Sequence, residues 1–154
     1  MRIRALGALA FAASLVPLVS CGSSTPLADT LPAATPTPTT ETFTGSVACC
    51  FNSDIKPFTI AQSGNVDITL TTLTLNGSPS TISMVLGIGT PSGTSCTLLS
   101  GGAINGPAGA SGTPNIAELS GGPLPAGAYC VQVTDVGNVP PNATVNYTVT
   151  VMHT

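Results

Sequence analysis

Four segments of this sequence carry apolar residues at every second position. They are residues 66–70, 82–88, 129–133 and 145–151. In the first segment Val66, Ile68 and Leu70 are apolar and the residues between them are polar. Successive side chains of a β-strand point to opposite faces of its sheet, so each segment presents one apolar face. Antiparallel strands bury such faces by packing two sheets together, which predicts a β-sandwich.

Turn-forming sequences separate the apolar segments. Glycine, proline, asparagine and serine gather in "QSGN" at 62–65, "NGSPS" at 76–80 and "VGNVPPN" at 136–142. These residue types favour tight turns. The spacing predicts about eight strands, near residues 43–50, 57–62, 65–75, 81–88, 95–99, 115–120, 127–135 and 144–152. We therefore expect an all-β fold with a single antiparallel β-sandwich.

Two details of the pattern predict local irregularities. The apolar positions change phase around Thr71 and Thr72, which predicts a bulge or a bend in that strand. The glycine-rich segment 101–114 is predicted to be the longest loop. Such loops often carry function, but this one offers only backbone and small side chains.

Composition agrees with a β-rich fold. Charged residues make up 6% of the chain, against about 25% in ordinary globular proteins. The helix formers Glu, Lys and Gln are scarce, so helices are not expected. Apolar residues make up 42% of the chain, which is too many for a compositionally disordered protein.

The first twenty residues have the features of an export signal. Arg2 and Arg4 precede an uncharged apolar run from residue 5 to residue 19, as in the basic and hydrophobic regions of a signal peptide. The run contains Pro17 and is shorter than the roughly 20 residues that a membrane-spanning helix needs. We therefore predict a signal peptide at residues 1–20 rather than a spanning helix.

The tripeptide Leu18-Val19-Ser20 before Cys21 resembles the lipobox of bacterial lipoproteins. The resemblance implies cleavage before Cys21, a diacylglyceryl group on its sulfur, and acyl chains that hold the protein on a membrane. Several acyl chains anchor stably where one does not. The alternative is an ordinary export signal followed by a chance cysteine. Gly22 and Ser23 lack the aspartate that retains many lipoproteins at the inner membrane, which favours the outer membrane, with a periplasmic or surface-facing domain.

Residues 21–42 are predicted to be the acylated cysteine and a linker. The segment is rich in proline, threonine and serine, and it contains "TPTPTT" at 35–40. Such a composition favours an extended polyproline-like chain at about 3.1 Å per residue. We expect it to act as a tether between the membrane and the folded domain.

Charge excludes several classes of partner. Without Arg2 and Arg4, the mature chain keeps Lys56 and one histidine against six acidic residues, a net charge of about −5. One lysine cannot neutralise a run of phosphates, so we expect no nucleic-acid binding. The same shortage argues against electrostatic docking on anionic lipid.

The end of the chain resembles the closing hairpin of bacterial pre-peptidase C-terminal domains. That family typically reads Gly-x-Tyr-x-Val-x-Val, a glycine-containing turn, and Tyr-x-(Leu/Val)-x-Val. The matching residues are Gly127, Tyr129, Val131, Val133, Tyr147, Val149 and Val151. Segments 43–47, 57–70 and 82–93 are similar to the family's opening strands.

This resemblance covers most of residues 43–154 and implies a domain with those bounds. It implies a jelly-roll-like β-sandwich that is non-catalytic and accompanies secreted peptidases and other surface proteins. No peptidase domain precedes it in this sequence, so we expect no peptidase-related role.

Four cysteines remain once Cys21 is acylated, namely Cys49, Cys50, Cys96 and Cys130. In an oxidising compartment this even set predicts two disulfides. Adjacent cysteines on a strand point to opposite faces, so a Cys49–Cys50 bridge requires an unusual local turn. We favour Cys50–Cys130 with Cys49–Cys96, and Cys96–Cys130 stays open. A metal or redox role is not expected, because the spacing Cys-x-x-Cys is absent and only one histidine is present.

The sequence does not predict an enzyme. His153 is the penultimate residue, where we expect a frayed end that cannot hold a catalytic base against a nucleophile. No Gly-x-Ser-x-Gly motif occurs.

Calcium is the one cofactor that deserves a test, because some relatives of this domain type bind it. The candidate ligands are Asp54, Asp67 and Asp135, which are dispersed in sequence, whereas calcium sites usually gather several oxygens. Asp135 in "TDVGN" also suits a turn in which its carboxylate caps backbone amides. We expect no resident cofactor.

These observations favour a membrane-tethered exported lipoprotein whose β-sandwich binds or interacts without catalysis. The partner would be an envelope polymer, a glycan or a protein. Two alternatives remain open, a structural envelope component without a specific ligand and a calcium-dependent adhesion or matrix-binding domain.

Overall fold

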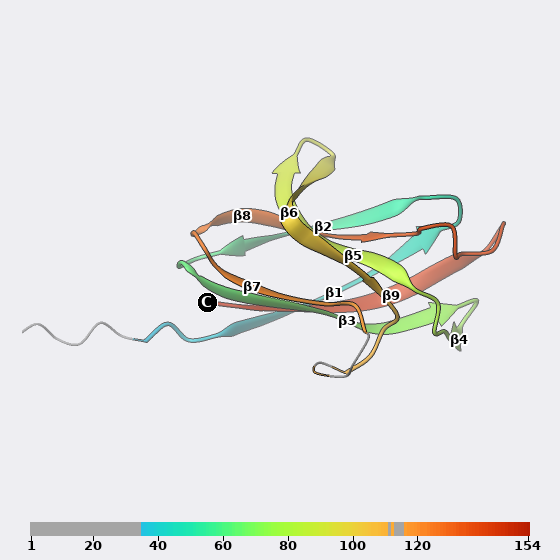
Figure 1. Cartoon of the computed structure of the whole chain (residues 1–154), viewed down its shortest axis with the longest axis horizontal. Coiled ribbons are helices and arrows are strands. Elements are labelled where there is room, and N and C mark those ends of the chain that lie inside the picture. The colour runs from blue at the N-terminus through green and yellow to red at the C-terminus, as the bar shows by residue number, and fades with distance from the viewer. Residues whose placement is uncertain (1–34, 111, 113–115) are drawn as a thin grey trace, which may run out of the picture. The chain divides into compact units, whose positions relative to one another are not determined.

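The structure is a computed structural model, and it describes residues 35–110, 112 and 116–154. The predicted signal peptide, Cys21 and most of the predicted linker lie outside the described residues. Within them the regular secondary structure is entirely β-strand (Figure 1). The described residues contain no helix long and apolar enough to cross a membrane.

Nine strands follow one another in the described part of the chain. They are β1 (Thr39–Ala48), β2 (Ser53–Ile60), β3 (Gly64–Leu75), β4 (Ser78–Pro79), β5 (Met84–Ser92), β6 (Ser95–Gly106), β7 (Glu118–Leu124), β8 (Gly127–Thr134) and β9 (Thr144–His153). Each of the eight predicted strands corresponds to one of these, and the two-residue β4 is additional. β1 begins inside the predicted linker, because Thr39 to Thr42 still pair with β9.

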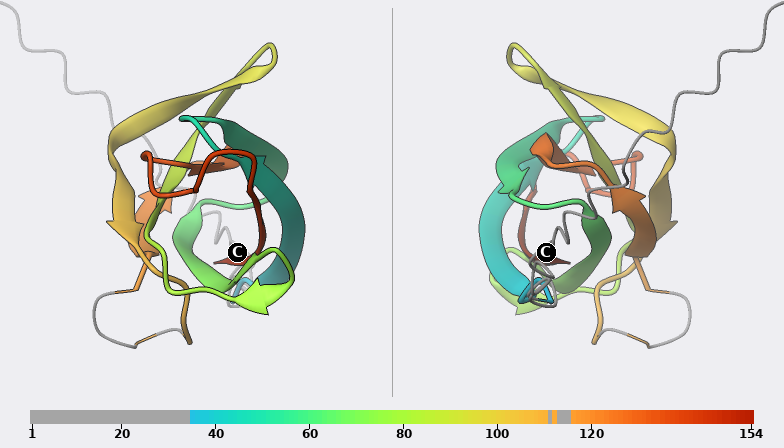
Figure 2. Two further views of the ribbon diagram at one scale, coloured as in Figure 1. Left: turned by 90° about the vertical axis from the view of Figure 1, so that its right-hand side faces the viewer. Right: turned by 90° about the vertical axis from the view of Figure 1, so that its left-hand side faces the viewer.

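The strands form two antiparallel sheets. One has the order β1-β9-β3-β4, with β7 also pairing with β3, and the other has the order β2-β8-β5-β6. The pairs are nested, since β1 pairs with β9, β2 with β8, β3 with β7, and β5 with β6. This nesting is the pattern of a jelly roll. Figure 2, which looks along the strands, shows the two layers facing each other. The predicted β-sandwich is confirmed.

The core lies between the two sheets and is built from the alternating positions of the sequence. Val145, Val149 and Val151 of β9 are fully buried, as are Leu70 of β3 and Leu86 of β5. Burying one such side chain contributes about 1.5–3 kcal/mol. The period-two pattern therefore accounts for the face that each strand buries.

Two predicted irregularities had different outcomes. The bulge is confirmed, because the register between β3 and β9 shifts between Leu70 and Thr72. The long loop at 101–114 is wrong in its first part, since β6 continues to Gly106. A Cβ atom at Gly102 would lie 2.8 Å from the Ile88 carbonyl oxygen. Glycine here permits a close approach of two backbones, rather than breaking the strand.

The described domain has two distinct ends. The chain enters at Thr39, which pairs with His153 near the C-terminus, so both termini of the domain lie at one end (Figure 1). β1 leads to residues 49–52 at the opposite end, where residues 135–143 also lie. We call these two segments the distal loops.

Candidate functional site

The turn at residues 49–52 has an unusual backbone. Cys50 and Phe51 have φ angles of 76° and 66°, so two consecutive residues other than glycine adopt the left-handed conformation. That conformation costs roughly 1–2 kcal/mol per residue, and tight turns of this kind usually contain Asn and Gly. Strain of this sort persists only where surrounding contacts hold it, and it is common at functional sites.

The Asp135 carboxylate holds this turn in place. Its side chain is fully buried, and it accepts five backbone hydrogen bonds. Oδ2 accepts from the amides of Cys50 (3.0 Å) and Phe51 (3.3 Å), and Oδ1 accepts from those of Gly137 (2.9 Å), Asn138 (2.9 Å) and Val139 (3.0 Å). Burial alone would raise the pKa of Asp135, but the backbone hydrogen bonds outweigh it and lower that pKa. The carboxylate is therefore charged and joins the two distal loops.

Further hydrogen bonds tie the same loops together. The Asn52 side chain donates to the Cys49 carbonyl at 2.6 Å. The Cys49 amide donates to the Ala143 carbonyl at 3.2 Å, and the Asp135 amide donates to the Asn52 carbonyl at 2.9 Å. The backbone of the turn is thus fixed on several sides.

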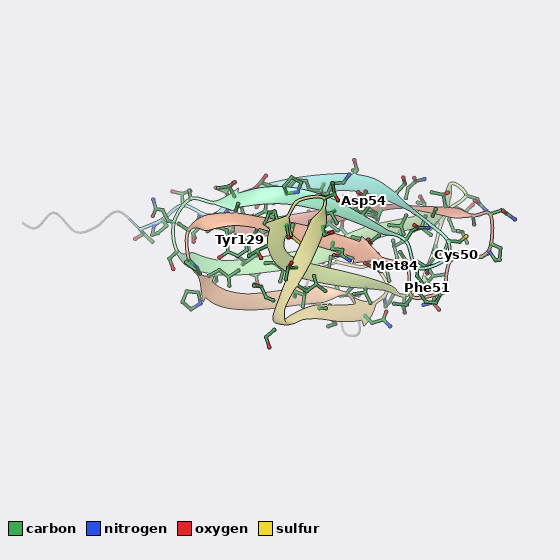
Figure 3. All side chains as sticks on the ribbon, turned by 90° about the horizontal axis from the view of Figure 1, so that it is seen from above. Cys50, Phe51, Asp54, Met84 and Tyr129 are labelled. Atoms are coloured by element: carbon green, nitrogen blue, oxygen red, sulfur yellow. A yellow bond between two sulfur atoms is a disulfide. The ribbon has the colours of Figure 1, made fainter. Side chains whose placement is uncertain are left out.

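This fixed turn displays an aromatic side chain to solvent. Phe51 is 74% exposed, and Figure 3 shows it beside Cys50 at the distal end. A Cβ atom at Gly137 would lie 3.3 Å from the Phe51 ring, so the ring rests close to the 135–143 backbone. Exposed Val136 lies next to this glycine. A large apolar side chain on a rigid, strained turn is a candidate contact residue for a partner.

The disulfide connectivity differs from the one we favoured. Cys96 and Cys130 are bonded, and Cys49 and Cys50 are free thiols. Cys50–Cys130 and Cys49–Cys96 are therefore wrong, and the open alternative Cys96–Cys130 is confirmed. Cys50 is exposed, while Cys49 packs against the core.

Glycine explains how this disulfide forms. Cys96 is on β6 and Cys130 is on β8, with β5 between them in the sheet. Gly89 of β5 pairs with Cys130, and a Cβ atom there would lie 2.9 Å from the Cys96 sulfur. Because Gly89 has no side chain, the β5–β6 hairpin bends over it, and the two Cα atoms come within 6.0 Å. Cys130 is fully buried.

A second polar cluster lies on β2 and β9. The Tyr147 hydroxyl donates to Asp54 Oδ2 at 2.9 Å, and Lys56 Nζ lies 3.1 Å from the same oxygen. Burial, followed by the hydrogen bond to Asp54, raises the pKa of Tyr147 well above its usual value. A Cβ atom at Gly45 would overlap both the Asp54 carboxylate and the Tyr147 hydroxyl. The cluster borders an open groove of about 540 Å³, which is also lined by Thr44, Ser46, Thr72, Thr74, Asn146 and Thr148. The contacts among Asp54, Lys56 and Tyr147 themselves have the character of a structural cluster.

The three calcium candidates lie on separate elements. Asp54 is on β2, Asp67 is on β3, and Asp135 follows β8. Asp54 already binds an ammonium group, and Asp135 faces five amide donors. In the described ranges no group of three or more His, Cys, Asp or Glu side chains is placed to hold a metal ion. The calcium-dependent alternative therefore has no defined site among the described residues, and the expectation of no resident cofactor stays a prediction.

The expectation for His153 is wrong. Its side chain is buried, because β9 continues through this residue and pairs with both β1 and β3. Nε2 lies 2.8 Å from Glu41 Oε1, and the ring packs 5.7 Å from that of Phe58. The histidine therefore helps to attach the start of β1 to the sandwich.

A small apolar cavity lies between the edges of β6 and β7. Its volume is about 180 Å³, and it is lined by Val66, Ile68, Ile88, Leu99, Ser100, Gly101, Gly102, Leu119, Ser120, Gly121, Gly122 and Leu124. Typical small-molecule pockets occupy about 300–1,000 Å³. This cavity is too small for such a ligand. We place the candidate site at the distal loops because an exposed aromatic side chain stands there on a fixed turn.

The comparisons with known proteins leave the family open. No protein-family model matches the chain, and no curated protein matches it. The resemblance to pre-peptidase C-terminal domains therefore stays a prediction.

Proposed function

We propose that this protein is an exported lipoprotein whose β-sandwich is held at a membrane by Cys21 and engages a partner through its distal loops without catalysis. The lipobox-like sequence supports the anchor. The Cys96–Cys130 disulfide supports export, because disulfides persist mainly in oxidising compartments.

The observation that carries the proposal is the direction in which β1 runs, from the end of the domain near the tether to the distal loops. The predicted tether runs into β1 at Thr39, and the ten residues of this strand span about 33 Å before the turn that bears Phe51. A tether at one end leaves the opposite end free to face a partner. The fixed backbone and the exposed ring at that end favour the binding function over a purely structural one.

The anchor is tested by cell fractionation of two matched variants. Cys21→Ser removes the acylated sulfur, and we expect the protein to leave the membrane fraction. Cys50→Ser removes an exposed thiol from the folded domain, and we expect it to stay with the membrane. Retention of Cys21→Ser, or equal release of both variants, would refute lipidation.

The binding function is tested on an array of glycans, envelope polymers and envelope proteins. Phe51→Ser should abolish a signal that the wild-type protein gives. Leu98→Ser changes another exposed apolar residue, on β6, and should leave the signal unchanged. A blank array with a folded wild-type protein would instead favour the structural alternative.

A further inference from the structure

Cys49 and Cys50 are adjacent free thiols at the distal end. In a regular strand, neighbouring side chains point to opposite faces and two such thiols would diverge. The left-handed conformation of Cys50 ends that alternation. Hydrogen bonding with the Cys49 side chain is the main cause that raises the pKa of the Cys50 thiol, ahead of desolvation and the charges of Cys49 and Asp135. Because the alternation ends at Cys50, the two thiols lie on consecutive residues of one turn.

We propose that Cys49 and Cys50 are a redox-active pair, which closes a vicinal disulfide by exchange with a low-molecular-weight organic disulfide. The backbone at this position departs from a regular strand, since Cys50 and Phe51 are both left-handed. Cys50 is exposed and reachable by a small disulfide, and Cys49 is half-buried beside it. This inference does not depend on the lipid anchor, since it uses only the folded domain.

The exchange consists of two successive displacement steps, in which atoms and electrons balance. The Cys50 thiolate attacks one sulfur of the donor disulfide, which forms a mixed disulfide and releases one donor thiolate. The Cys49 thiolate then attacks the Cys50 sulfur, closes the ring and releases the second donor thiolate. The cysteine pair loses two electrons and two protons, and the donor gains both as two thiols.

A metal centre is the other chemistry that two thiols suggest. Structural zinc sites need four protein ligands, and the described residues provide no group of three or more potential ligands. The nearest carboxylate, that of Asp135, is occupied by backbone amides on both oxygens. The surroundings of the pair therefore favour disulfide exchange over a metal ion.

The ring should open more easily than the Cys96–Cys130 bridge. Cα atoms across a trans peptide lie about 3.8 Å apart, below the roughly 4.4–6.8 Å usual for disulfides. A ring built across one peptide is strained, and strained or exposed disulfides are the labile ones. Cys130 is fully buried, so a mild thiol reductant reaches the distal pair first.

The test uses the full chain purified from the producing cells, whichever fraction contains it. The protein is gently reduced, incubated with or without oxidised glutathione, alkylated, and cleaved after acidic residues. Peptide 42–54, between Glu41 and Asp54, carries Cys49 and Cys50 and no other cysteine. Peptides 68–118 and 119–135 carry Cys96 and Cys130, and they should remain linked throughout as an internal control.

We expect peptide 42–54 to take two alkyl groups without oxidant. After oxidant it should take none and weigh two hydrogen atoms less than the dithiol. Full alkylation after oxidant, linkage of the peptide to another chain, or a metal ion that protects the thiols until a chelator is added would each overturn the proposal.

Single variants separate ring closure from simple thiol oxidation. Cys49→Ser and Cys50→Ser each leave one thiol in the turn, so each should accumulate a stable mixed disulfide with glutathione. The wild-type protein should form the mixed disulfide with glutathione only transiently, because closure of the Cys49–Cys50 ring releases the glutathione. A wild-type protein that stops at the mixed disulfide, as the variants do, would show that the two thiols do not act together.

Discussion

Replacing Asp135 with asparagine tests how the distal loops are held. The substitution keeps the shape of the side chain and removes its charge. The amide oxygen can still accept from Gly137, Asn138 and Val139. The amide nitrogen then faces the backbone amides of Cys50 and Phe51, which are 3.0 Å and 3.3 Å from the carboxylate in the wild-type protein.

The expected loss follows from those two hydrogen bonds. A hydrogen bond to a charged group contributes about 1.5–3 kcal/mol, so losing two removes about 3–6 kcal/mol. Part of this loss is offset, because water can bind the freed amides at the exposed turn. The left-handed residues can also relax, and each that does so recovers roughly 1–2 kcal/mol. We expect Asp135→Asn to lower the free energy of unfolding by about 2–4 kcal/mol.

Urea unfolding at neutral pH, with the disulfide intact, measures this difference. Asp67→Asn is the matched control, since Asp67 lies on β3 and accepts none of these bonds. Because folding lowers the pKa of Asp135, its contribution is present above the unfolded value of about 3.9 and is lost as pH falls through the folded value. A loss below about 0.5 kcal/mol, typical of a surface substitution, would refute the role given to this carboxylate.

Four further predictions rest on the described contacts. Cys96→Ser opens a bridge between residues 34 positions apart and should cost about 3–4 kcal/mol, so an unchanged guanidinium midpoint would argue against the bridge. Tyr147→Phe removes the bond to Asp54 and should cost about 1–2 kcal/mol. Because its pKa is raised, Tyr147 should ionise in alkali only on unfolding. In a Tyr129→Phe variant, where Tyr147 is the remaining tyrosine, a tyrosinate signal from the folded protein would contradict this. Millimolar calcium should leave the thermal midpoint unchanged, because Asp54 and Asp135 already have partners. A raised midpoint would indicate a calcium site.

The sandwich was predictable because side-chain alternation is a local property of a strand. Val66, Ile68 and Leu70 reveal their buried face without any knowledge of the partner strands. The change of phase after Leu70 likewise marks the bulge within a single segment. Sheet order was not available from periodicity, and the resemblance supplied the expectation of a jelly roll.

The distal site was only half predictable. The bonds from Asp135 to Gly137 and Asn138 lie within one turn, which the sequence "TDVGN" suggested. The bonds to Cys50 and Phe51 cross 85 and 84 residues, and no local pattern indicates them. The strained turn at Cys50 depends on those distant bonds, so the sequence alone did not predict it.

Two other errors concern the disulfide pairing and the end of β9. We favoured Cys49–Cys96, but the missing side chain of Gly89 allows Cys96 to reach Cys130 instead. His153 looked like a frayed end, but β1 and β3 enclose it on both sides. In each case the deciding contact joins strands that are far apart in sequence.

The mass of the N-terminal peptide of the mature protein tests the proposed function most directly. The protein would be extracted from cell membranes and cleaved after Asp29, which releases residues 21–29 if processing occurs before Cys21. We predict that this peptide begins at Cys21 and carries a diacylglyceryl group. A mature chain that begins elsewhere, or an unmodified Cys21 thiol, would contradict the anchored lipoprotein proposed here.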